Sequence, residues 1–218
     1  MTLTPLGDQA IIATLPDEAA AIRLSASIRT ANPAWLHDVV PAYATVGVFF
    51  DAERIETSAV VRWLQSLPKG STTASAFVGK LVTIPVCYEK GPDLARVAEQ
   101  TGRTWDEVIA LHSGSTYTVY AIGFVPGFPY LGYLPKELTG VPRLPSPRVR
   151  VEPGSVGLTG KQTGIYPLPR PGGWNLIGRT PLTIVDVEAG YFPLRVGDKV
   201  RFERIDEGEF TKRVGERI

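Results

Sequence analysis

The stretch Ile122–Pro181 reads IGFVPGFPYLGYLPKELTGVPRLPSPRVRVEPGSVGLTGKQTGIYPLPRPGGWNLIGRTP, and it decides the fold. Its 60 residues contain 11 of the 19 prolines and 11 of the 22 glycines in the chain. The apolar residues of this stretch do not recur at helical spacing. Loops this rich in glycine and proline have stiff, special backbone geometry and usually sit on a β scaffold. The segment therefore predicts a mostly β region, which we expect to be a barrel.

The residues on either side of this stretch supply further elements of the same region. A helix is predicted to open at Pro92 and to run to about Gln100, since proline suits the first helical turn. Thr104 and Glu107 form a T-x-x-E capping box, which predicts a second helix to about His112. Alternating apolar residues predict strands at Lys80–Cys87, Thr116–Ile122, Leu182–Val187 and Lys199–Ile205.

The first third of the chain has the pattern of a compact α/β domain. Amphipathic spacing predicts helices, and runs of β-branched and aromatic residues predict strands. In chain order the expected elements are a strand at Asp8–Thr14, a helix at Asp17–Thr30, a strand at Tyr43–Phe50 and a helix at Thr57–Leu67. Lys69–Ala76 is rich in Gly, Ser, Thr and Ala and is expected to be a linker. The predicted fold class is α+β, with a small α/β domain and its linker at residues 1–76 and a β-barrel domain at residues 77–218.

Composition narrows the class of protein. With 218 residues, of which 44% are hydrophobic and 21% charged, the chain is typical of a globular protein. Its net charge of +1 does not by itself indicate that the protein binds nucleic acid or a membrane surface. Met1–Ala10 lacks the basic and apolar regions of a signal peptide, and no window is apolar enough to span a membrane. The one cysteine, Cys87, cannot form an internal disulfide, so we expect a cytoplasmic protein.

Charge is distributed unevenly along the chain. Ile122–Pro181 has a net charge of +5, whereas the rest of the chain has −4. The basic residues of this region are Lys136, Arg143, Arg148, Arg150, Lys161, Arg170 and Arg179. Arginine grips carboxylate or phosphate with a planar fork, so these loops predict a site for an anionic ligand. The alternative is that several of these arginines are solvated or pair with a partner subunit.

Several catalytic motifs are absent from the sequence or incomplete in it. Gly154–Gln162 has five residues between its glycines, not the four of a phosphate loop, and it ends in glutamine where a hydroxyl should bind magnesium. A G-x-S-x-G nucleophile elbow is absent. Cys87 lies in an apolar strand and is interpreted as a small buried hydrophobe. One cysteine and two histidines cannot supply a structural zinc site, so no metal is expected.

Two features have both a structural and a functional interpretation. The aromatic run of Phe124, Phe128, Tyr130 and Tyr133 is either core packing beneath loops or the wall of a substrate pocket, and Trp174 is open to the same alternatives. His112 lies at a helix end, where a histidine is often a favourable cation or a cap. It is also the only histidine near the loop region, so a role in a site remains open.

Gly123–Leu131, which reads GFVPGFPYL, resembles the G-F-x-P-G-F-x-Y-L signature of the carboxyltransferase-like family. That family includes the B subunit of 5-oxoprolinase, proteins labelled allophanate hydrolase subunit 1 and the sporulation-kinase inhibitor. The resemblance covers most of residues 80–205, and Val151–Pro153 departs from the usual Val-Pro-Ala. Further matching segments are Val86–Tyr88, Gly91–Leu94, His112 with Tyr117–Tyr120, Pro147–Arg150, Gly154–Val156, Thr163–Pro167, Pro171–Trp174, Ile177–Pro181 and Gly197–Asp198.

The resemblance implies a small N-terminal α/β domain followed by a cyclophilin-like β-barrel. It implies two partners, a homologous C subunit with which the chain pairs and an unrelated A subunit, and a complex that uses ATP to open 5-oxo-L-proline to L-glutamate. The isolated chain is expected to be inactive. Two alternatives are half of a carboxyltransferase of the allophanate or urea carboxylase type, and a non-enzymatic inhibitor of a sensor histidine kinase. Fold alone does not decide among them.

The oxoprolinase interpretation assigns candidate roles within this sequence. His112 and Tyr120 are candidates for proton transfer or for orienting groups. The sequence has no obvious ATP site, so ATP is expected at an interface or on another subunit. The candidates for substrate binding are Phe124, Phe128 and Tyr130 as a wall and Arg143, Arg148, Arg150 and Arg179 as anion contacts.

Overall fold

The computed structural model describes residues 1–67 and 79–218, which belong to two compact units. The first unit contains the described residues up to 67, and the second runs from Gly79 to Ile218. The linker predicted at Lys69–Ala76 lies outside the described residues. The fold class predicted from the sequence, α+β with a small α/β part before a barrel-like sheet, is confirmed. Its cyclophilin-like character stays a prediction.

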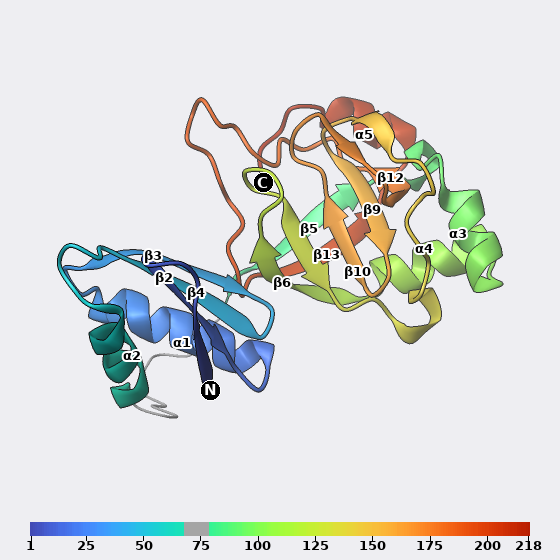
Figure 1. Cartoon of the computed structure of the whole chain (residues 1–218). Helices are drawn as coiled ribbons and strands as arrows, with labels where there is room; N and C mark the ends of the chain where they lie inside the picture. The colour runs from blue at the N-terminus through green and yellow to red at the C-terminus, as the bar shows by residue number, and fades with distance from the viewer. Residues whose placement is uncertain (68–78) are drawn as a thin grey trace. The chain divides into compact units, whose positions relative to one another are not determined.

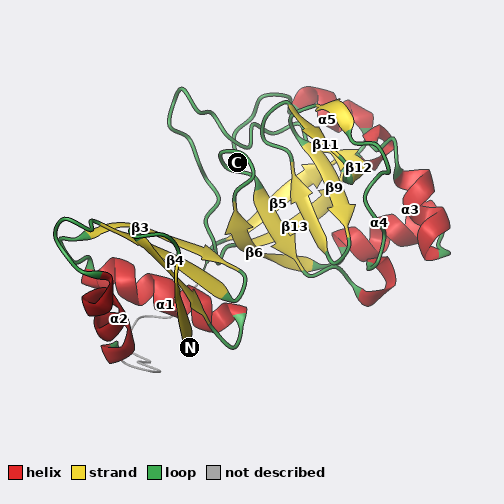
Figure 2. Ribbon diagram, viewed as in Figure 1, coloured by secondary structure: helices red, strands yellow, loops and turns green. Residues whose placement is uncertain are grey.

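The first unit is a four-stranded antiparallel sheet in the order β1-β2-β4-β3, with two helices on one face (Figure 2). Asp17 caps the first helix, because its carboxylate accepts a 2.7 Å hydrogen bond from the Ala20 backbone. The predicted helices and two of the strands are found, whereas β1 and β3 were not expected. The elements are β1 Thr2–Pro5, β2 Ala10–Thr14, α1 Glu18–Ala31, β3 Leu36–Ala42, β4 Thr45–Phe50 and α2 Thr57–Ser66.

The second unit is built on a seven-stranded sheet in the order β12-β9-β10-β7-β6-β13-β5, nearly closed into a barrel (Figure 1). β13 pairs in parallel with β5 and antiparallel with β6, so it joins segments far apart in the sequence. The strands are β5 Leu81–Val86, β6 Thr116–Ile122, β7 Pro129–Gly132, β9 Ser155–Thr159, β10 Gln162–Ile165, β12 Asn175–Arg179 and β13 Lys199–Arg204. A separate two-stranded ribbon is formed by β8 Arg148–Val151 and β11 Arg170–Gly172.

A backbone pair brings the two ends of this sheet together. The Cys87 backbone N–H donates to the Arg179 carbonyl at 2.9 Å, and the Arg179 N–H donates to the Cys87 carbonyl at 3.0 Å. Gly178 permits this approach, because a Cβ there would lie 2.6 Å from a methyl carbon of Val86. Cys87 follows β5 and Arg179 ends β12, so the pair forms a seam between the first and last strands of the sheet.

Helices cover part of the barrel-like sheet. α3 Leu94–Thr101 and α4 Trp105–Ser113 are neighbours in Figure 1, and α5 Glu207–Lys212 follows β13. The capping box is confirmed, since Glu107 accepts from the Thr104 backbone at 2.8 Å and its own N–H donates to the Thr104 hydroxyl at 3.3 Å. Short 3-10 helices occupy Tyr88–Lys90 and Lys136–Leu138.

The strand predicted at Leu182–Val187 is wrong. The segment forms only isolated bridges, one between Thr183 and Arg217 and one between Asp186 and Tyr191. Its apolar side chains suit a strand, but its backbone bonds locally and to the C-terminal residues, as in the 2.7 Å bond from Thr183 N–H to the Glu216 carbonyl. The six-residue helix α5 was also not predicted, because so short an element has almost no periodicity to detect.

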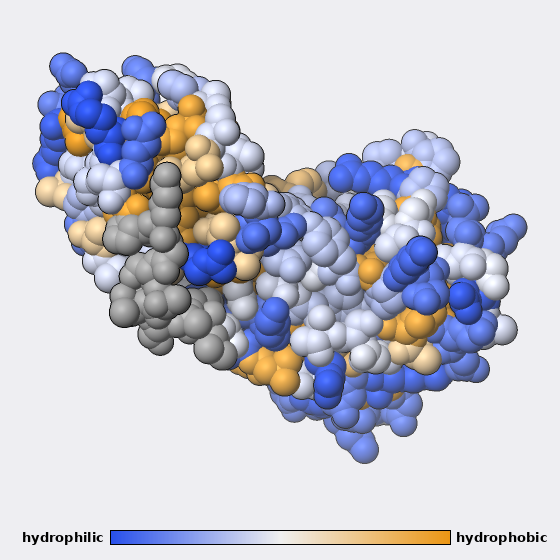
Figure 3. Space-filling model, turned by 90° about the horizontal axis from the view of Figure 1, so that it is seen from below, coloured by the Kyte–Doolittle hydropathy of each residue, from blue (hydrophilic) through white to orange (hydrophobic). Residues whose placement is uncertain are grey.

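The apolar surface of the second unit is broken up on the face shown in Figure 3. Apolar residues of the second unit form small patches there, separated by hydrophilic ones. Single exposed hydrophobic residues of this kind are normal for a folded protein. Among the described helices, none is long and apolar enough to cross a membrane.

Replacing Thr104 with alanine is expected to lower the free energy of unfolding by about 1 kcal/mol, because the first turn of α4 loses its side-chain cap. Urea denaturation followed by circular dichroism measures this change. The matched control is Ser146→Ala in an exposed loop, which should leave stability within about 0.5 kcal/mol. Equal effects from both variants would contradict the role of the capping box.

Candidate functional site

A pocket of about 220 Å³ lies among the glycine- and proline-rich loops of the second unit. Four of the residues predicted to bind substrate line it together, namely Phe124, Phe128, Tyr130 and Arg143. The remaining lining residues are Pro147, Tyr166, Pro171, Gly172, Gly173 and Trp174. Residues far apart in the sequence thus form one concave site, half of whose lining residues are aromatic.

Phe128 is the centre of the aromatic cluster. The residue is 1% exposed, and its ring stands edge-to-face with the rings of Tyr130 at 4.9 Å, Tyr166 at 5.2 Å and Trp174 at 5.4 Å between centroids. Edge-to-face packing is the favoured arrangement of aromatic rings and fixes their orientation. Phe128 is therefore part of the core and also lines the pocket with its neighbours, and the role of these rings as a substrate wall stays a prediction.

The loop that precedes Phe128 presents a second ring to solvent. Phe124 has a φ of 65°, in the left-handed region, and is 59% exposed. Gly127 has a φ of 75°, and a Cβ there would lie 2.2 Å from a methyl carbon of Val185. Only glycine fits that position without displacement, which explains this glycine of the GFVPGF motif. A non-glycine residue at positive φ is costly and is often found at functional sites.

Arg143 supplies the positive charge of the aromatic pocket. It is exposed, and among the described residues no carboxylate forms an ion pair with it. Burial raises the pKa of Tyr130 and of Tyr166, and the charge of Arg143 opposes the rise in both cases. Both phenols are therefore neutral at physiological pH and can donate hydrogen bonds. The pocket can receive a small anion at Arg143 with flat apolar walls beside it.

Arg148 is held by a carboxylate. Its Nη2 donates to Asp93 Oδ1 at 2.7 Å, and the other oxygen of Asp93 accepts from the Leu176 backbone at 2.7 Å. Asp93 is 7% exposed, so the pair is mostly buried. The Arg148 Nη1 atom is buried and has no hydrogen-bond partner among the described residues. The pair joins the start of α3 to β8 and β12, which gives Arg148 a structural role; contact with a substrate anion stays a prediction.

The other two candidate arginines lie elsewhere. Arg150 forms an exposed 2.7 Å ion pair with Glu152. Arg179 lines a second cavity, and its Nε donates to the Pro153 carbonyl at 2.9 Å. The four candidate arginines therefore do not converge on one anion site in this chain, and Arg143 is the one at the aromatic pocket.

His112 lies in the interior of the second unit. It has no exposed surface, and its ring stacks on Phe202 at 4.5 Å between centroids. The Thr163 hydroxyl donates to the Gly157 carbonyl at 3.0 Å, so it accepts from His112 Nε2 at 2.9 Å. The Tyr88 hydroxyl lies 2.7 Å from His112 Nδ1 and is then the donor. In this arrangement one ring nitrogen of His112 donates and the other accepts, as in a neutral imidazole. Burial lowers the pKa of His112 from 6.5 to about 3.

The positions of both catalytic candidates are thus separate from the aromatic pocket. The interior position of His112 fits its structural interpretation, and its catalytic role stays a prediction. Tyr120 is half-buried on β6, with its ring 5.5 Å from that of Tyr133, and it does not line the aromatic pocket. Its proposed role in proton transfer also stays a prediction.

Two residues of the site were not singled out from the sequence. Tyr166 lines the pocket, and Asp93 anchors Arg148 and Leu176. Each lies within a matching family segment, Thr163–Pro167 and Gly91–Leu94, and that was the only signal for either residue. A polar residue beside apolar ones does not reveal which distant backbone it will bind.

The buried neutral state of His112 predicts a loss of stability in acid. Unfolded histidine binds a proton near its ordinary pKa, whereas folded His112 does so only at about pH 3. The free energy of unfolding should therefore fall as pH drops below about 6.5, by up to about 1.4 kcal/mol per unit. Urea denaturation from about pH 7 to about pH 5 measures the slope.

A matched pair of variants isolates this contribution. His112→Gln removes the titrating group and should flatten the slope, whereas His37→Gln, at a side chain that is 59% exposed, should keep it. An unchanged slope in His112→Gln would show that His112 does not govern acid stability.

Replacing Arg148 with alanine is expected to lower the free energy of unfolding by about 2 kcal/mol or more, because Asp93 is left buried without its counter-ion. Replacing both residues with alanine should cost less than the sum of the single changes. Arg150→Ala is the control, because its exposed ion pair should be worth at most about 1 kcal/mol. Additive effects of the Asp93 and Arg148 changes in urea denaturation would contradict the proposed coupling.

Solved structures share this fold. A protein designated TTHA0988 matches with a TM-score of 0.80 at 37% identity, covering 91% of this chain and 40% of that one, so this chain spans about two fifths of its length. The urea carboxylase of Kluyveromyces lactis matches with a TM-score of 0.71 at 17% identity, over 97% of this chain and 22% of that one. The second likeness concerns the fold alone.

The family is established by sequence. A family model described as carboxyltransferase domain, subdomain C and D, matches residues 1–192. A Bacillus subtilis protein named as the B subunit of 5-oxoprolinase is 38% identical over 194 residues, covering 79% of this chain and 77% of the relative. The protein of the same name from Haemophilus influenzae is 38% identical over 216 residues, covering 93% and 97%. This chain therefore belongs to the carboxyltransferase-domain family, together with bacterial proteins named as the B subunit of 5-oxoprolinase.

Proposed function

We propose that this chain is the B subunit of an ATP-dependent 5-oxoprolinase, which opens 5-oxo-L-proline to L-glutamate. In this proposal it acts with two partners, a homologous C subunit together with an unrelated A subunit. Support comes from the relatives named as the B subunit of 5-oxoprolinase, which align over most of their own length. The structural observation that carries the proposal is the aromatic pocket with Arg143 beside it, whose guanidinium has no ion pair among the described residues.

The chemistry of the substrate suits this pocket. 5-Oxoproline is a small, nearly flat lactam ring with one carboxylate, and the cavity of about 220 Å³ is small. The carboxylate would be bound by the Arg143 guanidinium, and the ring would lie against Tyr130 and Trp174. The neutral phenol of Tyr130 is a hydrogen-bond donor suited to the lactam oxygen.

Opening a lactam requires activation of a stable amide. ATP can transfer its γ-phosphoryl group to the amide oxygen, which releases ADP. One water then adds to the carbon, and the C–N bond breaks as the amine takes a proton, which leaves an acyl phosphate. A second water hydrolyses this acyl phosphate to the carboxylate and phosphate. A site for this chemistry must exclude water until the amide is activated. Gly154 to Thr159 forms a turn and strand β9 rather than a loop before a helix, so it lacks the structure of a phosphate loop. In this proposal ATP binds at an interface or on another subunit.

A second candidate is half of a carboxyltransferase. The fold of the Kluyveromyces lactis urea carboxylase favours it, although a likeness at 17% identity concerns architecture and not chemistry. The oxoprolinase proposal also includes a cytoplasmic location, which suits the free and buried Cys87. The isolated chain is proposed to be inactive.

The decisive measurement is glutamate release from 5-oxoproline with ATP, using this chain purified with its homologous partner and the third subunit. Activity is expected only when all three are present, and omission of any one should abolish it. A fully assembled complex that releases no glutamate would overturn the oxoprolinase proposal. Biotin-dependent carboxyl transfer by that same complex would instead establish the second candidate.

Within the active complex, Arg143→Gln is expected to lower kcat/KM for 5-oxoproline by about tenfold or more, because a charge-assisted bond to the substrate carboxylate is lost. Arg170→Gln is the matched control, since Arg170 is exposed and its Nη1 bonds only the adjacent Pro169 carbonyl among the described residues. Steady-state kinetics at saturating ATP distinguish the two. Equal kinetics in both variants would remove Arg143 from the site.

A further inference from the structure

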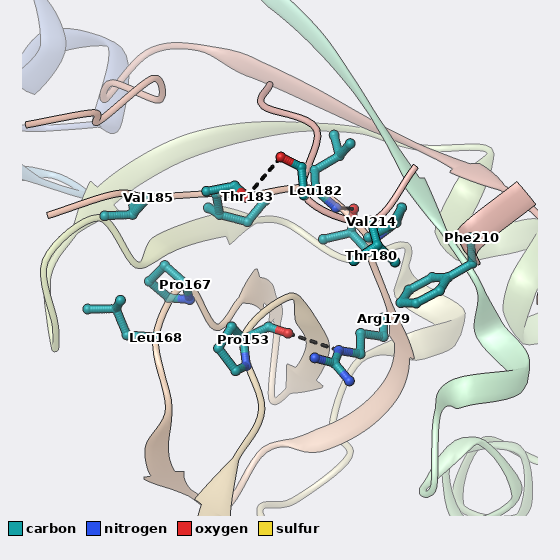
Figure 4. Close-up of a pocket in the computed structure, with 13 residues that line it drawn as sticks. Pro153, Pro167, Leu168, Arg179, Thr180, Leu182, Thr183, Val185, Phe210 and Val214 are labelled. Atoms are coloured by element: carbon teal, nitrogen blue, oxygen red, sulfur yellow. Dashed lines mark hydrogen bonds between the residues drawn. The ribbon is translucent and has the colours of Figure 1, made fainter. Parts of the chain in front are cut away.

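The second unit contains another cavity, of about 540 Å³, whose described lining residues are all different from those of the aromatic pocket (Figure 4). One wall consists of Pro153, Pro167 and Leu168, and the facing wall is the extended segment 180–185. Phe210 and Val214 lie at the end where Arg179 enters. Prolines and aliphatic side chains therefore form most of its lining, as in many pockets for small organic molecules.

Among the described residues that line this cavity, Arg179 is the only charged one. Its Nε is fixed by the 2.9 Å bond to the Pro153 carbonyl, and its backbone is fixed by the pair with Cys87. Its two terminal nitrogens have no hydrogen-bond partner in the described part of the chain, and no carboxylate there forms an ion pair with it. One carboxylate to consider is Glu152, whose ion-pair partner is Arg150 at 2.7 Å. The hydrogen bond from Arg150 lowers the pKa of Glu152, and the charge of Arg179 adds to this lowering.

The wall beside Arg179 is held in place by the C-terminal residues. Gly215 N–H donates to the Pro181 carbonyl at 3.1 Å, and Thr183 N–H donates to the Glu216 carbonyl at 2.7 Å. An ion pair of 2.8 Å joins Arg217 to Asp186. These bonds lie within the chain itself, so the fold holds this wall in place, which lowers the entropic cost of binding.

We propose that this cavity is a second binding site, which takes a small organic carboxylate with an extended apolar body. The guanidinium of Arg179 binds the carboxylate through its two terminal nitrogens, and the apolar body lies between Leu168 and Val185. The charge excludes organic cations. A single arginine also gives no match for a polyphosphate, whose several charges require several cations. The site lies beyond the proposed oxoprolinase chemistry, whose compact and polar substrate leaves most of this cavity unfilled.

The test uses the full chain and three probes with the same eight-carbon body, namely octanoate, octylammonium and 1-octanol. Binding is followed by NMR as shifts in the methyl signals of Leu168, Leu182 and Val185. Octanoate is expected to shift these signals saturably, 1-octanol to bind about tenfold or more weakly, and octylammonium not to bind. No saturable shift with octanoate, or equal affinity for octanoate and 1-octanol, would overturn the proposal.

Variants test where the carboxylate and the apolar body of the ligand bind. Arg179→Gln should weaken octanoate binding by about tenfold or more and leave 1-octanol unchanged. Leu168→Trp keeps every charge but fills the cavity, so it should weaken both probes. Arg170→Gln, on the exposed ribbon, is the control and should change neither. Because Arg179→Gln also loses the bond to Pro153, its thermal unfolding is measured, and Arg179→Lys is tested beside it. If a folded Arg179→Gln binds octanoate as well as the unchanged chain, the proposal fails.

Discussion

The backbone pair between Cys87 and Arg179 is the interaction on which the second unit depends. Its two hydrogen bonds, of 2.9 and 3.0 Å, connect the segment after β5 to the end of β12, the two outer strands of a seven-stranded sheet. Exposed strand edges leave backbone groups unpaired, and closing the sheet satisfies part of them. The bond of 2.9 Å from Asp93 N–H to the Leu176 carbonyl continues the same seam. The absence of a side chain at Gly178 lets the two segments approach this closely.

The seam also positions both cavities. Asp93, whose N–H belongs to the seam, holds Arg148 on one carboxylate oxygen and the Leu176 backbone on the other, which fixes the ribbon β8–β11 and the start of β12 beside the aromatic pocket. Arg179 contributes its backbone to the seam and its side chain to the second cavity. Since these groups sit on paired backbone rather than on free loops, the fold itself fixes their geometry, which lowers the entropic cost of binding. The glycine- and proline-rich loops therefore act as walls supported by a closed sheet.

The arginines of the loop region differ in whether they form an ion pair. Two of its arginines are neutralised by carboxylates, Arg148 by Asp93 and Arg150 by Glu152, at 2.7 Å in each case. Arg143 and Arg179 have no ion pair among the described residues, and they line separate cavities. A positive stretch of sequence thus yields two single-arginine sites instead of one strongly charged surface. His112 was a candidate for proton transfer, but both of its ring nitrogens form hydrogen bonds in the core, with Tyr88 and Thr163.

The sequence by itself determined the elements whose cause is local. The capping box of Thr104 and Glu107 and the strand Thr116–Ile122 follow from neighbouring residues, and the density of glycine and proline predicted short strands with stiff loops. The motif around Phe128 indicated the family and contains three residues of the aromatic pocket, and the positive charge of the loop region indicated a fourth, Arg143. Only the tertiary structure decided which arginines carry no ion pair, because pairing of Arg148 with Asp93 depends on a contact across 55 positions of the sequence. The same holds for Leu182–Val187, whose strand-like pattern is overridden by hydrogen bonds to the C-terminal residues, and for the second cavity, whose walls meet only when the sheet closes.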